Sequence, residues 1–89
     1  MNELDVTIVN RLGLHARAAA KFVHLAGEFV SRVTVSREGT RVDGKSILGL
    51  LTLAASKGTK LRLLIQGDDE VEAGTKLAEL IRSRFGEDA

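Results

Sequence analysis

His15 stands where a turn meets an alanine-rich segment, and Arg17 follows two residues later. A neutral imidazole has a nitrogen lone pair that can attack phosphorus. If a helix begins at Ala16, its first backbone N–H groups, that of Ala16 included, have no partner in the helix and carry partial positive charge. This field suits an anion on the ring and disfavours imidazolium. Because the Arg17 guanidinium also fits phosphate oxygens, the segment predicts a site that accepts and holds a phosphoryl group.

Four strands and three helices are expected to position this segment. Apolar residues in strand-like runs between turn signals predict strands at residues 4–9, 32–36, 40–43 and 60–66. Helical spacing predicts helices at residues 16–26, at 47 to about 53, and after Gly67, the last with an apolar face of Val71, Leu77, Ala78, Ile81 and Phe85. The order β-α-β-β-α-β-α predicts an α+β fold whose antiparallel sheet carries its helices on one face.

The composition narrows the class of protein. A chain of 89 residues predicts one domain over residues 1–89, and 44% hydrophobic with 28% charged residues is typical of a globular protein. A formal net charge of +1 and only three Phe, with no Trp or Tyr, argue against nucleic-acid binding. Without cysteine, disulfides and thiolate metal sites are excluded. The N-terminal residues do not resemble a signal peptide and the apolar runs are too short for a bilayer, so we expect a cytoplasmic protein without membrane insertion.

Two segments, residues 13–17 (GLHAR) and residues 44–50 (GKSILGL), resemble the histidine-containing phosphocarrier (HPr) family of the bacterial phosphoenolpyruvate-dependent phosphotransferase system (PTS). The resemblance extends along essentially the whole chain. It implies an open-faced β-sandwich, with a four-stranded antiparallel sheet and three helices on one face. It further implies that His15 receives a phosphoryl group on Nδ1 from phosphorylated Enzyme I and passes it to EIIA-type acceptors, with Arg17 helping to hold it. Such a protein is a carrier, not an enzyme; we expect a monomer without a metal or organic cofactor.

Ser46 is a favourable N-cap for the second predicted helix. By the same resemblance, it is a regulatory site for an ATP-dependent HPr kinase/phosphorylase. Phosphoserine would place charge beside an apolar patch expected to bind partners, Ile47, Leu48 and Leu51, where its desolvation would be costly and would weaken docking of Enzyme I. The same apolar residues are also typical of a core.

Two positions depart from the family pattern. Ala18 stands where the family commonly has proline, and we expect this change to be tolerated because alanine is the best helix former. Leu12 stands where a small polar residue is common. Its apolar side chain removes one hydrogen-bonding group near the phosphoryl group, with consequences for transfer rate or partner preference.

Other interpretations stay open or fit less well. The downstream pathway is sugar uptake or a nitrogen-related regulatory branch, and neither motif separates them. A regulatory domain that binds partners without chemistry at His15 would keep its affinity after His15→Ala. Residues 39–46, from Gly39 to Ser46, match the nucleotide-binding pattern G-x-x-x-x-G-K-[ST], but a hairpin strand and a short helix are a poor context for it. His24 lies about half a turn away from His15 around the same predicted helix, so we interpret it as a surface residue that cannot share a metal ion with His15.

Overall fold

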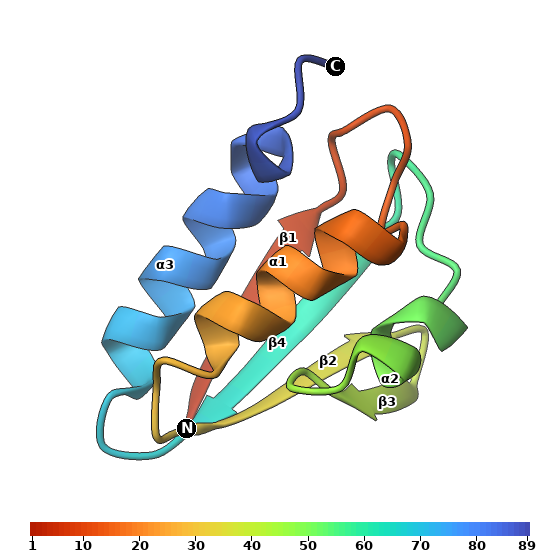
Figure 1. Cartoon of the computed structure of the whole chain (residues 1–89). Coiled ribbons are helices and arrows are strands. Elements are labelled where there is room, and N and C mark those ends of the chain that lie inside the picture. Colours follow the sequence, from red (N-terminus) through yellow and green to blue (C-terminus); the bar gives the residue numbers. More distant parts are fainter.

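The computed structural model describes residues 1–89, and Figure 1 shows its helices lying over one side of a twisted sheet. The strands are β1 (Asn2–Thr7), β2 (Arg32–Arg37), β3 (Thr40–Asp43) and β4 (Lys60–Gln66). The helices are α1 (Ala16–Ala26), α2 (Ile47–Thr52) and α3 (Glu70–Arg82), followed by a 3-10 turn, η1 (Arg84–Gly86). The predicted order of elements is confirmed, with η1 as an addition.

The sheet has the order β1-β4-β2-β3, and every neighbouring pair is antiparallel. Its inner face pairs apolar side chains across the strands, such as Val6 with Leu61 and Val33 with Ile65. These side chains meet the buried faces of the helices, where Phe22 of α1 and Leu77 of α3 are almost fully enclosed. Burial of this apolar surface is the main force that holds the helices on the sheet. The predicted open-faced sandwich is confirmed.

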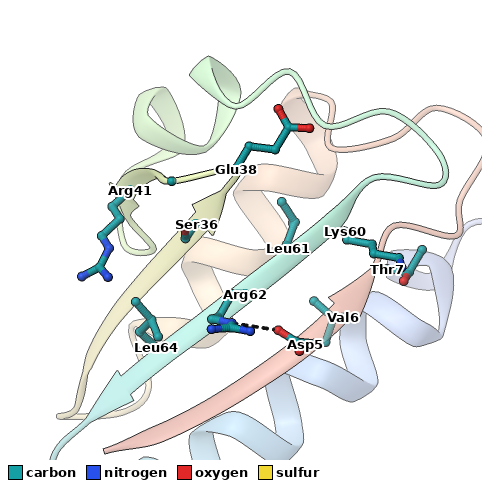
Figure 2. A pocket seen from close by; sticks show the side chains of 11 residues that line it. Asp5, Val6, Thr7, Ser36, Glu38, Arg41, Lys60, Leu61, Arg62 and Leu64 are labelled. Carbon is teal, nitrogen blue, oxygen red and sulfur yellow. Dashed lines mark hydrogen bonds and ion pairs between the residues drawn. The ribbon is translucent and has the colours of Figure 1, made fainter.

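The other face of the sheet carries no helix, and Figure 2 shows polar and charged side chains across it. Asp5 on β1 and Arg62 on β4 form an ion pair there, with 2.9 Å between Oδ1 and Nε. Both side chains are mostly exposed, so this pair contributes little to stability.

The first strand lies earlier than predicted, at Asn2–Thr7 instead of residues 4–9. Pairing with β4 ends where Thr7 faces Lys60, because the chain turns immediately before Lys60. Ile8 still exchanges hydrogen bonds with this turn: its N–H donates to Thr59 O, and its C=O accepts from Gly58 N. The alternation of side chains therefore continues beyond the regular strand.

The prediction of a single apolar helical face from Val71 to Phe85 is wrong at both ends. Val71 is exposed, and α3 ends at Arg82. Phe85 lies in η1 with φ +54°, a left-handed conformation that a continuing α-helix excludes. Its ring is buried and its carbonyl accepts a hydrogen bond of 2.7 Å from Lys21 Nζ, so packing against α1 selects the turn.

A membrane-spanning helix is absent, and even the longest helix, α3 with 13 residues, is too short for that role.

Candidate functional site

His15 is the N-cap residue of α1, as its place in the sequence predicted. Its backbone is extended and its ring caps no amide of the helix. The first hydrogen bond of the helix runs from Ala19 N to His15 O, and the N–H groups of Ala16, Arg17 and Ala18 donate to no protein group. With no acidic residue in the first turn, these amides present partial positive charge beside the ring.

The loop that leads into α1 is held by buried contacts on both sides. Asn10 is fully buried, and its Nδ2 donates to Gly13 O at 2.8 Å. Leu14 is buried against the core, and its N–H donates to Ala55 O at 2.8 Å. Because these bonds fix the residues immediately before His15, the entry of the chain into α1 is determined before the helix begins.

Gly13 is required at its position for two independent reasons. Its φ is +69°, in the left-handed region that glycine adopts without a steric penalty. A Cβ at this position would lie 2.5 Å from Ala55 O, a backbone atom that cannot rotate away. The glycine before the histidine therefore allows the loop to lie against the segment that follows α2.

A carboxylate from the far end of the chain contacts the ring. Glu87 follows η1, and its Oε2 lies 2.5 Å from His15 Nε2. Figure 1 shows why these residues meet: the C-terminal segment lies at the same end of the molecule as the loop before α1. The His15 side chain is 28% exposed and that of Glu87 17%, so the ring is partly covered but not enclosed. Nδ1 takes part in no hydrogen bond with the protein.

Asn10 also holds the Glu87 carboxylate in place, by donating from Nδ2 to Oε1 at 2.9 Å. The hydrogen bond from His15 and, next, that from Asn10 lower the pKa of Glu87 below its ordinary value, because both stabilise the ionised carboxylate. Asn10 Oδ1, in contrast, is buried without a hydrogen-bond partner. The carboxylate is thus anchored on one oxygen and presents the other to the ring.

Arg17 and His15 line the same surface cavity. This cavity of about 220 Å³ also includes residues from both ends of the chain: Arg11, Leu12, Glu87, Asp88 and Ala89. The exposed guanidinium of Arg17 forms no hydrogen bond or ion pair with the protein, so all of its N–H donors remain available. An anion attached to the ring would meet these donors and the free amides of α1.

Ser46 is the N-cap of α2, and its Oγ accepts a hydrogen bond of 3.0 Å from Gly49 N. The apolar residues of the predicted partner-binding patch divide into two groups. Ile47 and Leu48 are exposed, at 40% and 77%, whereas Leu51 is half-buried against the core. Only the first two residues of the patch are exposed, and of these only Leu48 faces mainly solvent.

The nucleotide-binding pattern at residues 39–46 lacks the structure that its chemistry needs. β3 is a hairpin strand paired antiparallel with β2, and α2 has only six residues. Gly44 N donates to Val33 O, and Lys45 Nζ donates to Phe29 O at 2.7 Å. The amide and the ammonium group that would bind phosphates are already engaged within the fold.

The two departures from the family pattern have different environments. Ala18 is fully buried, and its N–H makes no hydrogen bond, so a proline at this position would lose none and alanine adds one free donor. Leu12 is 63% exposed and lines the His15 cavity, where it contributes apolar surface only. His24 is exposed on α1 and is not among the residues of that cavity.

The sequence analysis did not identify Asn10 or Glu87 as residues of the site. An asparagine in the predicted turn was the one available signal for Asn10, and only the structure shows that it is buried. Glu87 is separated from His15 by 72 positions and gives no local signal.

Comparison with known proteins decides the family. A family model described as "PTS HPr component phosphorylation site" matches residues 2–83. This chain belongs to the HPr family. The phosphocarrier protein HPr of Cupriavidus necator is 54% identical over 87 residues, which cover 98% of both chains. An HPr crystal structure from Thermoanaerobacter tengcongensis covers 100% of both chains with a TM-score of 0.96 and 44% identity.

A second structure from that organism, described as an HPr dimer, covers 98% of this chain and 100% of its own with a TM-score of 0.78 and 45% identity. Members of the HPr family are phosphocarriers of the PTS. As an HPr, this protein is a carrier and not an enzyme.

Proposed function

We propose that His15 accepts a phosphoryl group from phosphorylated Enzyme I and passes it to EIIA-type acceptors, as a monomer in the cytoplasm. The observation that carries this proposal is the arrangement at the start of α1. A partly exposed imidazole adjoins three amides that donate to no protein group, and an unpaired guanidinium lines the same cavity. Nucleophile and anion-binding donors thus occur together on one face.

The same arrangement suits a carrier that must also release its cargo. The donors are exposed or at a helix terminus, so they hold the phosphoryl group without enclosing it. Holding it too strongly would stabilise the phosphorylated ground state and slow the next transfer. A surface cavity whose two arginines, Arg11 and Arg17, are both exposed therefore fits a transient intermediate better than a tight phosphate site.

Incubation with phosphoenolpyruvate and Enzyme I tests this function. We expect one phosphoryl group per chain, labile in acid and stable in alkali, that is absent in His15→Ala. His24→Ala is the matched control, because it removes an exposed imidazole from the same helix and should keep full labelling. Labelling that survives His15→Ala would reject the proposal.

We also propose that Ser46 is a regulatory phosphorylation site for an HPr kinase/phosphorylase. A phosphate there would lie directly before the exposed Ile47 and Leu48 and beside the half-buried Leu51, and its hydration would oppose burial of this surface by Enzyme I. ATP-dependent labelling by the kinase should disappear in Ser46→Ala. Phosphorylation at Ser46 should slow transfer from Enzyme I to His15, and an unchanged transfer rate would contradict the regulatory role.

A dimeric HPr among the similar structures gives the monomer prediction a clear alternative. Light scattering of the purified protein across a range of concentrations tests it. A constant mass near the 9.6 kDa of one chain is expected. A mass that doubles with concentration would replace the monomer by a dimer.

A further inference from the structure

The contact between Glu87 and His15 determines which ring nitrogen carries the proton. A glutamate carboxyl is ionised at neutral pH, and the hydrogen bonds from His15 and Asn10 lower the pKa of Glu87 further. An ionised carboxylate can only accept a hydrogen bond, so Nε2 must donate its N–H across the 2.5 Å contact. In the neutral ring, the lone pair is then on Nδ1, which no protein group engages.

We propose that Glu87 is a positioning residue of the carrier: it keeps the His15 proton on Nε2, leaves Nδ1 as the nucleophile and balances the positive charge that the ring gains with a phosphoryl group. This inference rests on the proposed function of His15. It adds a residue that lies beyond the matched range 2–83 of the family model.

The chain reaches this position through an unusual backbone. Arg84, Phe85 and Gly86 have consecutive positive φ values of 60°, 54° and 78°. A non-glycine residue in this region is strained, so the surrounding contacts must select the conformation of Arg84 and Phe85. The buried Phe85 ring and the bond from Lys21 Nζ to its carbonyl supply two such contacts.

Contacts beyond the turn fix the carboxylate itself. Asn10 Nδ2 holds Glu87 Oε1, and Arg11 N donates to Ala89 O at 3.0 Å. Two hydrogen bonds therefore attach the segment after η1 to the loop before α1, one at the Glu87 carboxylate and one at the backbone of Ala89. The left-handed turn and the hydrogen bond from Asn10 together fix the position of the Glu87 carboxylate against the ring.

The chemical step balances with Glu87 in this role. The Nδ1 lone pair forms a bond to phosphorus while the donor's bond to phosphorus breaks and its electron pair stays with the donor. The ring now carries a positive charge and still holds the proton on Nε2, opposite the carboxylate. In the onward step, a lone pair of the acceptor forms a bond to phosphorus while the pair of the Nδ1–phosphorus bond returns to the ring, which leaves as neutral imidazole with the same proton. A good leaving group results without any proton exchange with solvent.

Other charged groups face the ring, and their effect must be separated from that of Glu87. The cavity around His15 includes the cations Arg11 and Arg17 and the carboxylate of Asp88. The positive charge of Lys21, on α1, also lowers the pKa of Glu87. Asp88 forms no hydrogen bond or ion pair with the ring. It is therefore a matched control for removal of one negative charge from the same cavity.

Nitrogen-15 NMR of the neutral His15 ring in wild type, Glu87→Gln and Asp88→Asn tests the inference without any transfer reaction. Glutamine preserves the size of the side chain and removes its charge. The shifts of the two ring nitrogens report which of them carries the proton. We expect the proton to lie almost entirely on Nε2 in wild type and Asp88→Asn, and to lie on Nδ1 in a clearly larger fraction of molecules in Glu87→Gln. The same tautomer populations in wild type and Glu87→Gln would overturn the role of Glu87.

Transfer kinetics provide the second readout. Glu87→Gln should pass its phosphoryl group to the acceptor roughly tenfold more slowly, because no carboxylate then holds the Nε2 proton and balances the charge of the ring. Asp88→Asn should transfer at the wild-type rate. Wild-type rates in Glu87→Gln at every pH would also contradict the inference. The function of His15 itself fails only if wild type takes no label, so the two failures are distinguishable.

Discussion

The first turns of α1 and α2 use their N-cap residues in opposite ways. At α2, Ser46 Oγ accepts a hydrogen bond from Gly49 N, three residues along the chain. At α1, the His15 ring leaves the helix amides free and contacts Glu87, 72 residues away. Ser46 thus satisfies its own helix, whereas His15 is oriented by a distant part of the fold.

This difference separates a helix start that leaves its amides free from one that caps them. A cap that binds the amides stabilises the helix and removes donors that an anion would use. At α1 the amides of Ala16, Arg17 and Ala18 are kept available, and stability comes from the loop contacts of Asn10 and Leu14 instead. Five changes test how far this contrast extends.

The largest effect is expected from Gly13→Ala, which alters the support of α1. The new Cβ would meet Ala55 O at 2.5 Å, and φ +69° would strain the residue. We expect a loss of about 2–3 kcal/mol in the free energy of unfolding, measured by urea denaturation. Gly49→Ala in α2 is the comparison, because the new Cβ would lie no closer than 3.3 Å to any neighbour, the nearest being Ser46 Oγ. We expect it to change the free energy of unfolding by less than about 1 kcal/mol. Equal losses would show that the two helix starts do not differ in this way.

Ser46→Ala should cost about 1 kcal/mol, because Gly49 N loses its acceptor. Thermal and urea unfolding measure this loss. Ser46→Asp is the control, since an aspartate side chain can cap the same amide and should recover most of the stability. A Ser46→Ala variant as stable as wild type would mean that water replaces the cap without cost.

His15→Asn should increase the stability of the start of α1, whereas Ser46→Ala decreases that of α2. An asparagine side chain can accept from the free amide of Arg17 or Ala18, so helix capping should gain about 0.5–1 kcal/mol, reduced by loss of the Glu87 contact. We expect unfolding no easier than in wild type, together with complete loss of phosphorylation. A clear loss of stability would indicate that the ring contributes more to the fold than to the reaction.

Ala54→Gly should stabilise the end of α2 by about 0.5 kcal/mol. Ala54 follows the C-cap Leu53 with φ +50°, a position where helices prefer glycine. The bonds that Arg37 donates to the carbonyls of Leu53 and Ala54 remain possible in the variant. Chemical denaturation would detect the gain, and lower stability would show that the flexibility of glycine in the unfolded chain outweighs the relief of strain.

The smallest change is a pKa shift at Glu87 in His15→Ala. Loss of the ring removes the first cause of the lowered pKa, so the pKa of Glu87 should rise toward its ordinary value. A carboxyl with a lower pKa in the folded than in the unfolded state stabilises the fold above its unfolded pKa, and this contribution is lost as pH falls through the folded pKa. The acid side of the stability profile should therefore flatten in His15→Ala. Carbon-detected NMR titration checks the shift, and Asp69, whose pKa is lowered by Ser31, should titrate as in wild type.

Much of the fold could be predicted from local pattern. The bounds of α1, β3 and β4 agree with the predicted ranges at residues 16–26, 40–43 and 60–66. Each is a segment whose periodicity changes clearly at its ends, with a glycine or a polar residue as the boundary. The helix face that ends at Phe85 was mistaken, because a buried aromatic at helical spacing gives the same signal whether the helix continues or turns.

The sequence by itself determined that the proposed nucleophile, His15, lies at a helix start and that Ser46 caps α2, because each position depends on residues within a few places of one another. Only the tertiary structure decided that Asn10 and Glu87 complete the site. That contact requires α3 to pack on the sheet and the left-handed turn at Phe85 to direct the last residues toward α1. Contacts between residues far apart in the chain leave no periodic trace, since they are selected by the burial and geometry of the whole fold.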